Sequence, residues 1–135
     1  MHWIIIVFVL IIIDQLTKWA ASLLNWSIFL NNDFAFSLPV PIVLMYAIYV
    51  SVLTGIGVYL FKSWHRFDHK QKLAWSFVLA GGLSNIGERI MLGAVRDFIP
   101  IANGMLNVAD FFILGGLILL LVSQRFADSK ATEKF

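Results

Sequence analysis

Long stretches without charge are the feature that most restricts how this chain folds. Residues 40–61 contain no charged side chain, and about 20 apolar residues in a helix span the hydrocarbon core of a bilayer. Charged residues make up only 13% of the 135 residues, whereas a soluble domain carries roughly 25%. Most of the surface therefore faces something other than water. We predict one polytopic membrane domain over residues 1–135.

Four segments are apolar enough to be membrane spans, at about residues 3–24, 40–61, 73–92 and 108–122. Seven of the ten Lys and Arg residues lie in the 62–72 connection or in the tail after the fourth span. Basic segments stay in the cytoplasm, so both termini are predicted to be cytoplasmic. The Gly115-Gly116 pair in the fourth span would permit close helix packing.

The two outward connections, residues 25–39 and 93–107, are more than simple tethers. The first mixes aromatic and β-branched residues with an Asn-Asn-Asp turn signal, and the second contains an extended VRDFIP segment. We therefore predict an all-α membrane protein, with four transmembrane helices and a small β-rich extracytoplasmic cap.

Several classes of chemistry are excluded or disfavoured. The chain has no cysteine, which excludes disulfides and thiolate catalysis. A net charge of +2 is too small to indicate nucleic-acid binding. His65 and His69 have helical spacing, but they lie in a basic connection without an acidic ligand pattern. We interpret them as solvated, and we predict no metal site.

Two polar groups interrupt the first and third spans. Asp14 and Lys18 are four residues apart, so they share one helix face as a structural pair or as part of a site. Near the outer end of the third span lie Asn85, Glu88 and Arg89. Arg89 alone would reach the headgroups, but three polar groups on one face indicate a site.

Asp97 and Asp110 form the third group, and both are predicted at the outer side at similar depth. Asn107, three residues before Asp110, would share its helix face. Two neighbouring carboxyls hold one proton between them, which suits general acid–base catalysis. In the alternative, Asp110 caps the fourth helix and Asp97 faces water. A proton or cation relay and a non-catalytic assembly protein are the competing functions.

Five motifs occur in order along the chain: DQLTKWA (14–20), NNDFAFS (31–37), GGLSNIGER (81–89), VRDFIP (95–100) and NVADFFILGG (107–116). Together they resemble the lipoprotein signal peptidases, also called signal peptidase II, over nearly the whole chain. The resemblance implies an aspartic endopeptidase of the bacterial cytoplasmic (inner) membrane, with its active site toward the extracytoplasmic side. Such enzymes remove signal peptides from diacylglyceryl-modified prolipoproteins, cutting before the lipidated cysteine.

The resemblance makes Asp97 and Asp110 the catalytic pair. Seven further residues would support the pair or bind the substrate: Asp14, Lys18, Asn31, Asn85, Glu88, Arg89 and Asn107. Proton transfer and positioning suffice for this chemistry, so no metal or organic cofactor is expected. Expected partners are lipidated signal peptides and membrane lipid, with no nucleic acid, and we expect a monomer.

Three positions depart from the pattern of the family. Glu88 stands where an Asp usually precedes the Arg, so the charge is kept but the reach is longer. Asp33 and Phe34 replace the usual Gly and Ala. The stretch between Asp97 and Asp110 is shorter than in many members, which suggests a trimmed outer loop.

Overall fold

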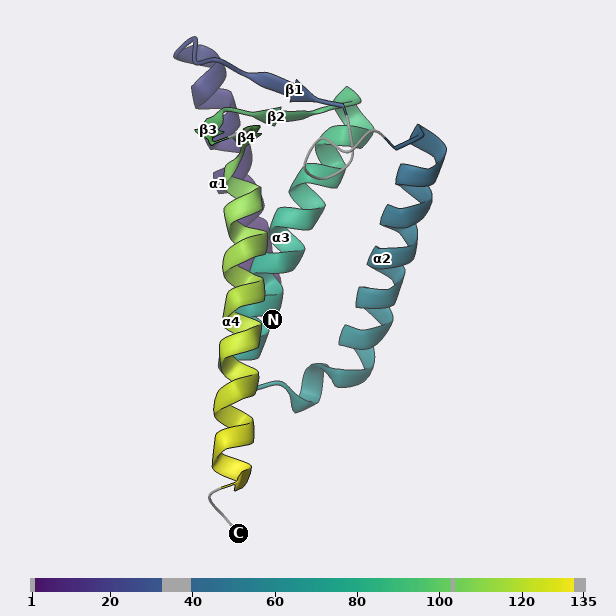
Figure 1. Cartoon of the computed structure of the whole chain (residues 1–135), viewed down its shortest axis with the longest axis vertical. Coiled ribbons are helices and arrows are strands. Elements are labelled where there is room, and N and C mark those ends of the chain that lie inside the picture. Colours follow the sequence, from purple (N-terminus) through teal and green to yellow (C-terminus); the bar gives the residue numbers. More distant parts are fainter. Residues whose placement is uncertain (1, 33–39, 103, 133–135) are drawn as a thin grey trace.

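A computed structural model describes residues 2–32, 40–102 and 104–132, with side chains as far as Gln124. The chain is mostly helical, with short strands at one end of the helices (Figure 1). In chain order the elements are α1 (His2–Leu23), β1 (Phe29–Asn31), α2 (Ile42–Ser63), the 3-10 helix η2 (Trp64–Arg66), α3 (His69–Leu92), β2 (Val95–Asp97), β3 (Ile99–Ile101), β4 (Gly104–Leu106) and α4 (Val108–Thr132).

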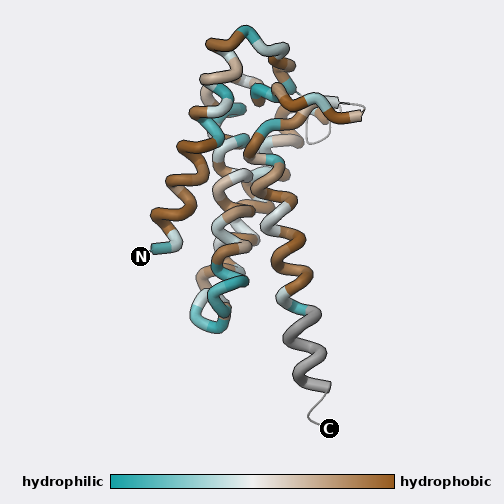
Figure 2. The backbone as a smooth tube through the Cα atoms, turned by 90° about the vertical axis from the view of Figure 1, so that its left-hand side faces the viewer, coloured by the Kyte–Doolittle hydropathy of each residue, from teal (hydrophilic) through white to brown (hydrophobic). Residues whose placement is uncertain are grey.

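Four helices occur where four spans were predicted, but they differ in character. Within the described residues, α1 and the segment Ile42–Arg66 are long and apolar enough to cross a membrane, and Val108–Gln124 is a shorter apolar segment. Figure 2 shows the helix at the N-terminus as hydrophobic along most of its length. Large apolar side chains point outward, such as Phe61, which is 88% exposed. Such a surface suits contact with lipid.

Two helix boundaries differ from the prediction. α3 begins at His69 instead of residue 73, because Asp68 and Gln71 form a capping box. The Gln71 N–H donates to Asp68 Oδ1 (2.7 Å), and the Asp68 N–H donates to Gln71 Oε1 (3.1 Å). α4 continues to Thr132 instead of residue 122, because the polar segment that follows contains neither Gly nor Pro to end it.

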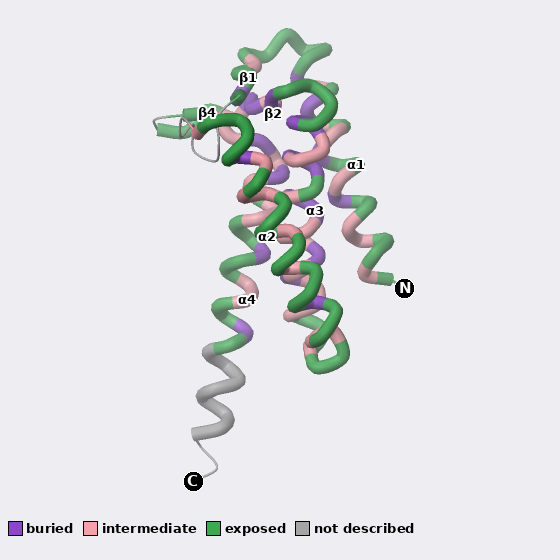
Figure 3. The backbone as a smooth tube through the Cα atoms, turned by 90° about the vertical axis from the view of Figure 1, so that its right-hand side faces the viewer, coloured by how far each residue is buried: buried purple, intermediate pink, exposed green. Residues whose placement is uncertain are grey.

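α3 is the central helix and packs against both α1 and α4. Its buried residues run from Ala74 to Arg89, and Figure 3 shows buried segments of the chain gathered next to the strands. Two glycines allow α3 and α4 to approach closely. A Cβ on Gly81 would overlap the carbonyl oxygen of Ala109, and one on Gly116 would lie 2.6 Å from the carbonyl oxygen of Ala74. Gly115 has no such neighbour, so only one member of the predicted glycine pair serves packing.

α2 stands to one side of the other helices (Figure 1). Aromatic side chains connect it to α3 at both ends. The Tyr46 hydroxyl donates to the backbone oxygen of Arg89 (3.1 Å), and the Tyr59 ring centroid lies 5.7 Å from that of Trp75. Only Met45 and Leu60 of α2 are buried, so most of this helix presents its side chains to the surroundings.

The predicted β-rich cap consists of two antiparallel pairs of strands. β1 pairs with β2 although 63 residues separate Asn31 from Val95 at the end of the register, which sets Phe29 opposite Asp97. β3 and β4 form a hairpin with Ile99 opposite Leu106. The hairpin leads directly into α4, so the cap brings the end of β2 close to the first turn of that helix.

Candidate active site

Asp97 is the last residue of β2, and its carboxylate is buried, with only 2% exposed. Its Oδ1 accepts a hydrogen bond from Asn107 Nδ2 (2.6 Å), and its Oδ2 accepts one from Asn31 Nδ2 (3.1 Å). The pairing of β1 with β2 explains the second contact, because Asn31 and Asp97 are diagonal neighbours on one face of the sheet. The interpretation that Asp97 simply faces water is therefore wrong.

Asp110 is the third residue of α4, and Asn107 precedes the helix. The two residues form reciprocal hydrogen bonds. The Asp110 N–H donates to Asn107 Oδ1 (3.1 Å), and the Asn107 N–H donates to Asp110 Oδ2 (3.0 Å). This is the geometry of a capping box, with Asn107 at the cap position. Asp110 Oδ1 accepts a further hydrogen bond from Asn85 Nδ2 of α3 (2.9 Å).

Asn107 joins the two aspartates, because its amide donates to Asp97 while its amide oxygen and backbone N–H bind Asp110. Burial raises the pKa of the Asp97 carboxyl above its ordinary value. Hydrogen bonds from Asn107 and Asn31 oppose that rise, and the negative charge of Asp110 adds to it. Asp97 therefore keeps its proton to a higher pH than an ordinary carboxyl does.

Lys18 is fully buried and has three polar partners. Its Nζ lies 2.8 Å from Asp14 Oδ2, 3.0 Å from Glu88 Oε2 and 3.0 Å from Asn85 Oδ1. The predicted Asp14–Lys18 pair is therefore present as part of a larger network. Asp14 Oδ1 also accepts the backbone N–H of Ala109 (2.8 Å), which connects α1 to the first turn of α4.

The sequence reasoning missed three side chains of this network: Gln15, Ser84 and Arg96. The Ser84 hydroxyl donates to Asp14 Oδ2 (2.6 Å) and accepts from Gln15 Nε2 (2.9 Å). Arg96 binds Glu88 through its guanidinium (2.6 Å). All three lie within the quoted motifs, and that position was the one signal that could have identified them.

Comparison with known proteins identifies the family of this chain. A family model described as "Signal peptidase (SPase) II" matches residues 6–126. The chain belongs to the signal peptidase II family. It is 32% identical to a lipoprotein signal peptidase of Acinetobacter baumannii over 142 residues, which cover 89% of this chain and 81% of the relative. It is 25% identical to a lipoprotein signal peptidase of Listeria monocytogenes over 152 residues, 98% of each chain.

Solved structures share the fold of this signal peptidase II family member. A bacterial membrane enzyme matches with a TM-score of 0.80 at 23% identity, over 96% of this chain and 90% of the other. A second bacterial membrane enzyme matches with a TM-score of 0.76 at 22% identity, over 91% and 92%. Membership of the family makes the protein a peptidase, and the apolar helices agree with a membrane-bound one.

The remaining predicted residues have other contacts or lie outside the described part of the chain. The Arg89 guanidinium lies 5.7 Å from the Tyr49 ring centroid, in cation–π contact with α2. His65 and His69 are exposed, as predicted. Among the described residues, no group of three or more His, Cys, Asp or Glu side chains could hold a metal ion. Asp33 and Phe34 lie outside the described residues.

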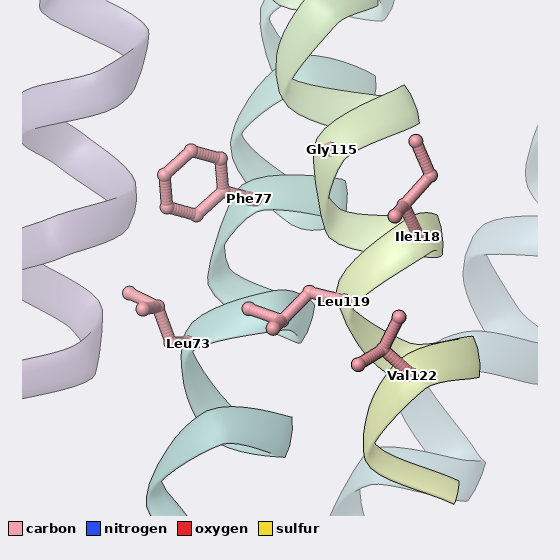
Figure 4. Close-up of a pocket in the computed structure, with 6 residues that line it drawn as sticks. All are labelled: Leu73, Phe77, Gly115, Ile118, Leu119 and Val122. Carbon is pink, nitrogen blue, oxygen red and sulfur yellow. The ribbon is translucent and has the colours of Figure 1, made fainter. Parts of the chain in front are cut away.

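A hollow of about 360 Å³ lies between α3 and α4 (Figure 4). It is lined by Leu73, Phe77, Gly115, Ile118, Leu119 and Val122. None of these side chains can ionise or donate a hydrogen bond. The side chains that line the hollow therefore offer this signal peptidase II family member no acid, base or nucleophile, in contrast to the polar cluster around Asp97 and Asp110.

Proposed function

We propose that the protein is an aspartic endopeptidase that removes signal peptides from prolipoproteins. Its substrates would carry a diacylglyceryl group on the cysteine that follows the cut bond. One observation carries the aspartic assignment: the Asn107 side chain binds Asp97 and Asp110 at once, and each of the four carboxylate oxygens accepts one N–H. Membership of the family and the names of the relatives support the class of substrate.

In this proposal all four helices cross the bacterial cytoplasmic membrane, with both termini inside. The aspartates and strands lie at one end of the helices, and the basic 62–72 connection joins α2 and α3 at the opposite end (Figure 1). Basic connections remain in the cytoplasm. The active site would therefore face the extracytoplasmic side, where the cleavage site of a translocated prolipoprotein also lies.

The two carboxyls differ in ways that support different roles. Asp97 is buried, whereas Asp110 is partly exposed, so Asp97 suits the protonated acid, because burial disfavours a charged carboxylate. Asp110 lies in the first turn of α4, where the positive end of the helix dipole favours a negative charge. We therefore assign the general base to Asp110 and the general acid to Asp97, which is the usual division in a carboxyl pair.

The reaction then balances without a cofactor. Asp110 takes a proton from water as the water oxygen bonds to the scissile carbonyl carbon, and Asp97 gives its proton to the carbonyl oxygen. When the tetrahedral intermediate collapses, the carbonyl reforms and returns a proton to Asp97. The C–N bond breaks, and the leaving amine takes the proton from Asp110.

The arrangement of the acidic side chains disfavours the alternative of a proton or cation relay. Four carboxylates form one connected cluster, namely Asp14, Glu88, Asp97 and Asp110. Of the acidic side chains that the structure describes, only Asp68 lies elsewhere, at the opposite end of α3. A proton or cation relay requires ionisable side chains at successive depths of the membrane, whereas a hydrolytic site requires its acidic side chains close together.

Cleavage by the purified protein tests the proposal. A diacylglyceryl-modified prolipoprotein should shift to the mature size on a gel, and the unmodified form should not. Asp97→Asn and Asp110→Asn should each abolish the shift, since an amide keeps the size of the carboxyl but does not exchange the proton. Asp68→Asn, at the opposite end of the molecule, is the matched control and should cleave normally. Near-normal cleavage by either active-site variant would refute the aspartic assignment.

A further inference from the structure

Arg96 belongs to the polar network but has no role in the reaction proposed above, and its side chain is held by several contacts. Arg96 lies between Val95 and Asp97 in β2. Because neighbouring residues of a strand point to opposite faces, the Arg96 side chain lies on the face opposite to that of Asp97. The Arg96 Nε and Nη2 atoms both lie 2.6 Å from Glu88 Oε1, and Nη2 lies 3.2 Å from Gln15 Oε1. The backbone N–H of Arg96 donates to Glu88 Oε2 (3.2 Å). Glu88 thus binds both the side chain and the backbone of Arg96.

A chain of polar contacts runs from this pair to Asp110. Glu88 Oε2 accepts from Lys18, Lys18 donates to Asn85 Oδ1, and Asn85 Nδ2 donates to Asp110 Oδ1. An ammonium group can only donate, so Lys18 requires the amide oxygen of Asn85. The NH₂ group of Asn85 must then face Asp110. Each contact in the chain depends on the one before it.

The charges around this chain balance. Lys18 and Arg96 carry two positive charges, and Asp14 and Glu88 carry two negative charges. Three of the four side chains are at most 4% exposed, and Arg96 is 23% exposed. A charge that loses its partner at such a site is poorly screened. Without Arg96, one excess negative charge would remain next to the aspartate pair.

We propose that Arg96 is a positioning residue for the two aspartates. Through Glu88 it holds β2, which ends in Asp97, and through Glu88, Lys18 and Asn85 it orients the donor to Asp110. This role also accounts for the departure at residue 88, because the longer Glu side chain reaches the guanidinium of Arg96. The inference rests on the proposed aspartic peptidase function.

The test compares kcat, KM and the pH profile of kcat/KM for lipidated prolipoprotein cleavage. The charged groups around Asp97 come from every element packed at the site: Asp14 and Lys18 of α1, Glu88 and Arg89 of α3, Arg96 of β2 and Asp110 of α4. Arg96→Met leaves an excess negative charge, which disfavours ionisation of Asp97 and moves the profile to higher pH. Glu88→Gln leaves an excess positive charge and moves it to lower pH.

The double variant Arg96→Met/Glu88→Gln restores the balance of charge, and its profile should return toward that of the wild type. Displacement of a catalytic group by 1 Å costs about 100-fold in rate, so kcat should fall between about 10-fold and 100-fold in Arg96→Met with little change in KM. Arg96→Lys should keep the pH profile and lose less activity than Arg96→Met. Lysine keeps the positive charge, but it lacks the planar guanidinium that binds a carboxylate through several N–H groups. Arg66→Met, at an exposed arginine of η2, is the matched control and should resemble the wild type.

Opposite pH shifts separate positioning and charge balance from a purely structural role. The inference would be overturned if the pH profiles of Arg96→Met and Glu88→Gln shifted in the same direction, or if Arg96→Met kept the wild-type kcat and pH profile. In either case the proposed peptidase function would still stand, provided that the wild type cleaves the lipidated prolipoprotein. If Arg96→Met does not fold in detergent, Arg96→Lys and Glu88→Gln still decide the outcome through their different profiles. If Asp97→Asn cleaves as well as the wild type, the proposed function fails and this inference fails with it.

Discussion

Gly81 lies where α3 crosses the first turn of α4. This turn contains Asp110, the proposed general base. A Cβ at this position would overlap the carbonyl oxygen of Ala109 and lie 2.7 Å from Cγ1 of Ile113. Carbon atoms in ordinary contact are about 3.5–4.0 Å apart, so the two helices must separate by about 1 Å. The Ile113 side chain can rotate, but a backbone oxygen moves only when α4 moves with it.

Gly81→Ala should therefore affect stability and activity together. Overpacking of this kind costs about 1–3 kcal/mol of folding free energy. The Ala109 N–H is bound to Asp14 Oδ1 (2.8 Å), and Asp110 is the next residue, so movement of the turn displaces the carboxyl directly. A displacement of 1 Å at a catalytic group costs about 100-fold in rate. We expect kcat to fall by about that factor.

The assay is cleavage of lipidated prolipoprotein by purified Gly81→Ala, with thermal unfolding measured on the same detergent-solubilised sample. Gly82→Ala is the matched control, because a Cβ on Gly82 would meet no atom within 4 Å. It should keep the wild-type rate. The reasoning fails if Gly81→Ala cleaves at the wild-type rate, or if Gly82→Ala is impaired to the same degree.

Three further predictions follow from the polar contacts. Lys18→Met leaves two buried carboxylates without their ammonium partner and should lower the free energy of unfolding by about 3–5 kcal/mol, measured by denaturation in detergent. Asn31→Leu removes a hydrogen bond that lowers the pKa of Asp97. The pKa of Asp97 should then rise further, so the alkaline limb of the kcat/KM profile should move to higher pH, and a move to lower pH would contradict the assignment. Asp68→Ala removes the cap of α3 and should cost about 1 kcal/mol in thermal stability with kcat unchanged.

The sequence was most informative where contacts depend on helical spacing or on depth in the membrane. Asp14 and Lys18 are four residues apart, and their ion pair forms at 2.8 Å. Asp97 and Asp110 were predicted to lie on one side at similar depth, and the β3–β4 hairpin returns the chain so that both bind Asn107. In both cases a local rule determines the geometry.

Contacts that depend on tertiary register were not predictable. The pairing of β1 with β2 brings Asn31 to Asp97, and no local signal states which residues of two distant loops lie opposite each other. The rotation of α4 about its axis determines that Gly116, not Gly115, meets α3. The Arg96–Glu88 contact depends on how β2 folds back over the end of α3. Long charged side chains have many possible partners, and spacing alone does not select one.

The alternative that Asp110 caps α4 is wrong in its residue, because Asn107 occupies the cap position and Asp110 completes the capping box from the first turn. This place in the capping box is compatible with the proposed role of Asp110 as general base. Capping uses only Oδ2, which accepts the Asn107 N–H, while Oδ1 is oriented by Asn85. A carboxylate oxygen has a second lone pair, so either oxygen can still accept a proton from water. The capping box thus holds the carboxyl in one orientation at the positive end of α4. A carboxyl held in this way is preorganised for the role of general base that we propose for Asp110.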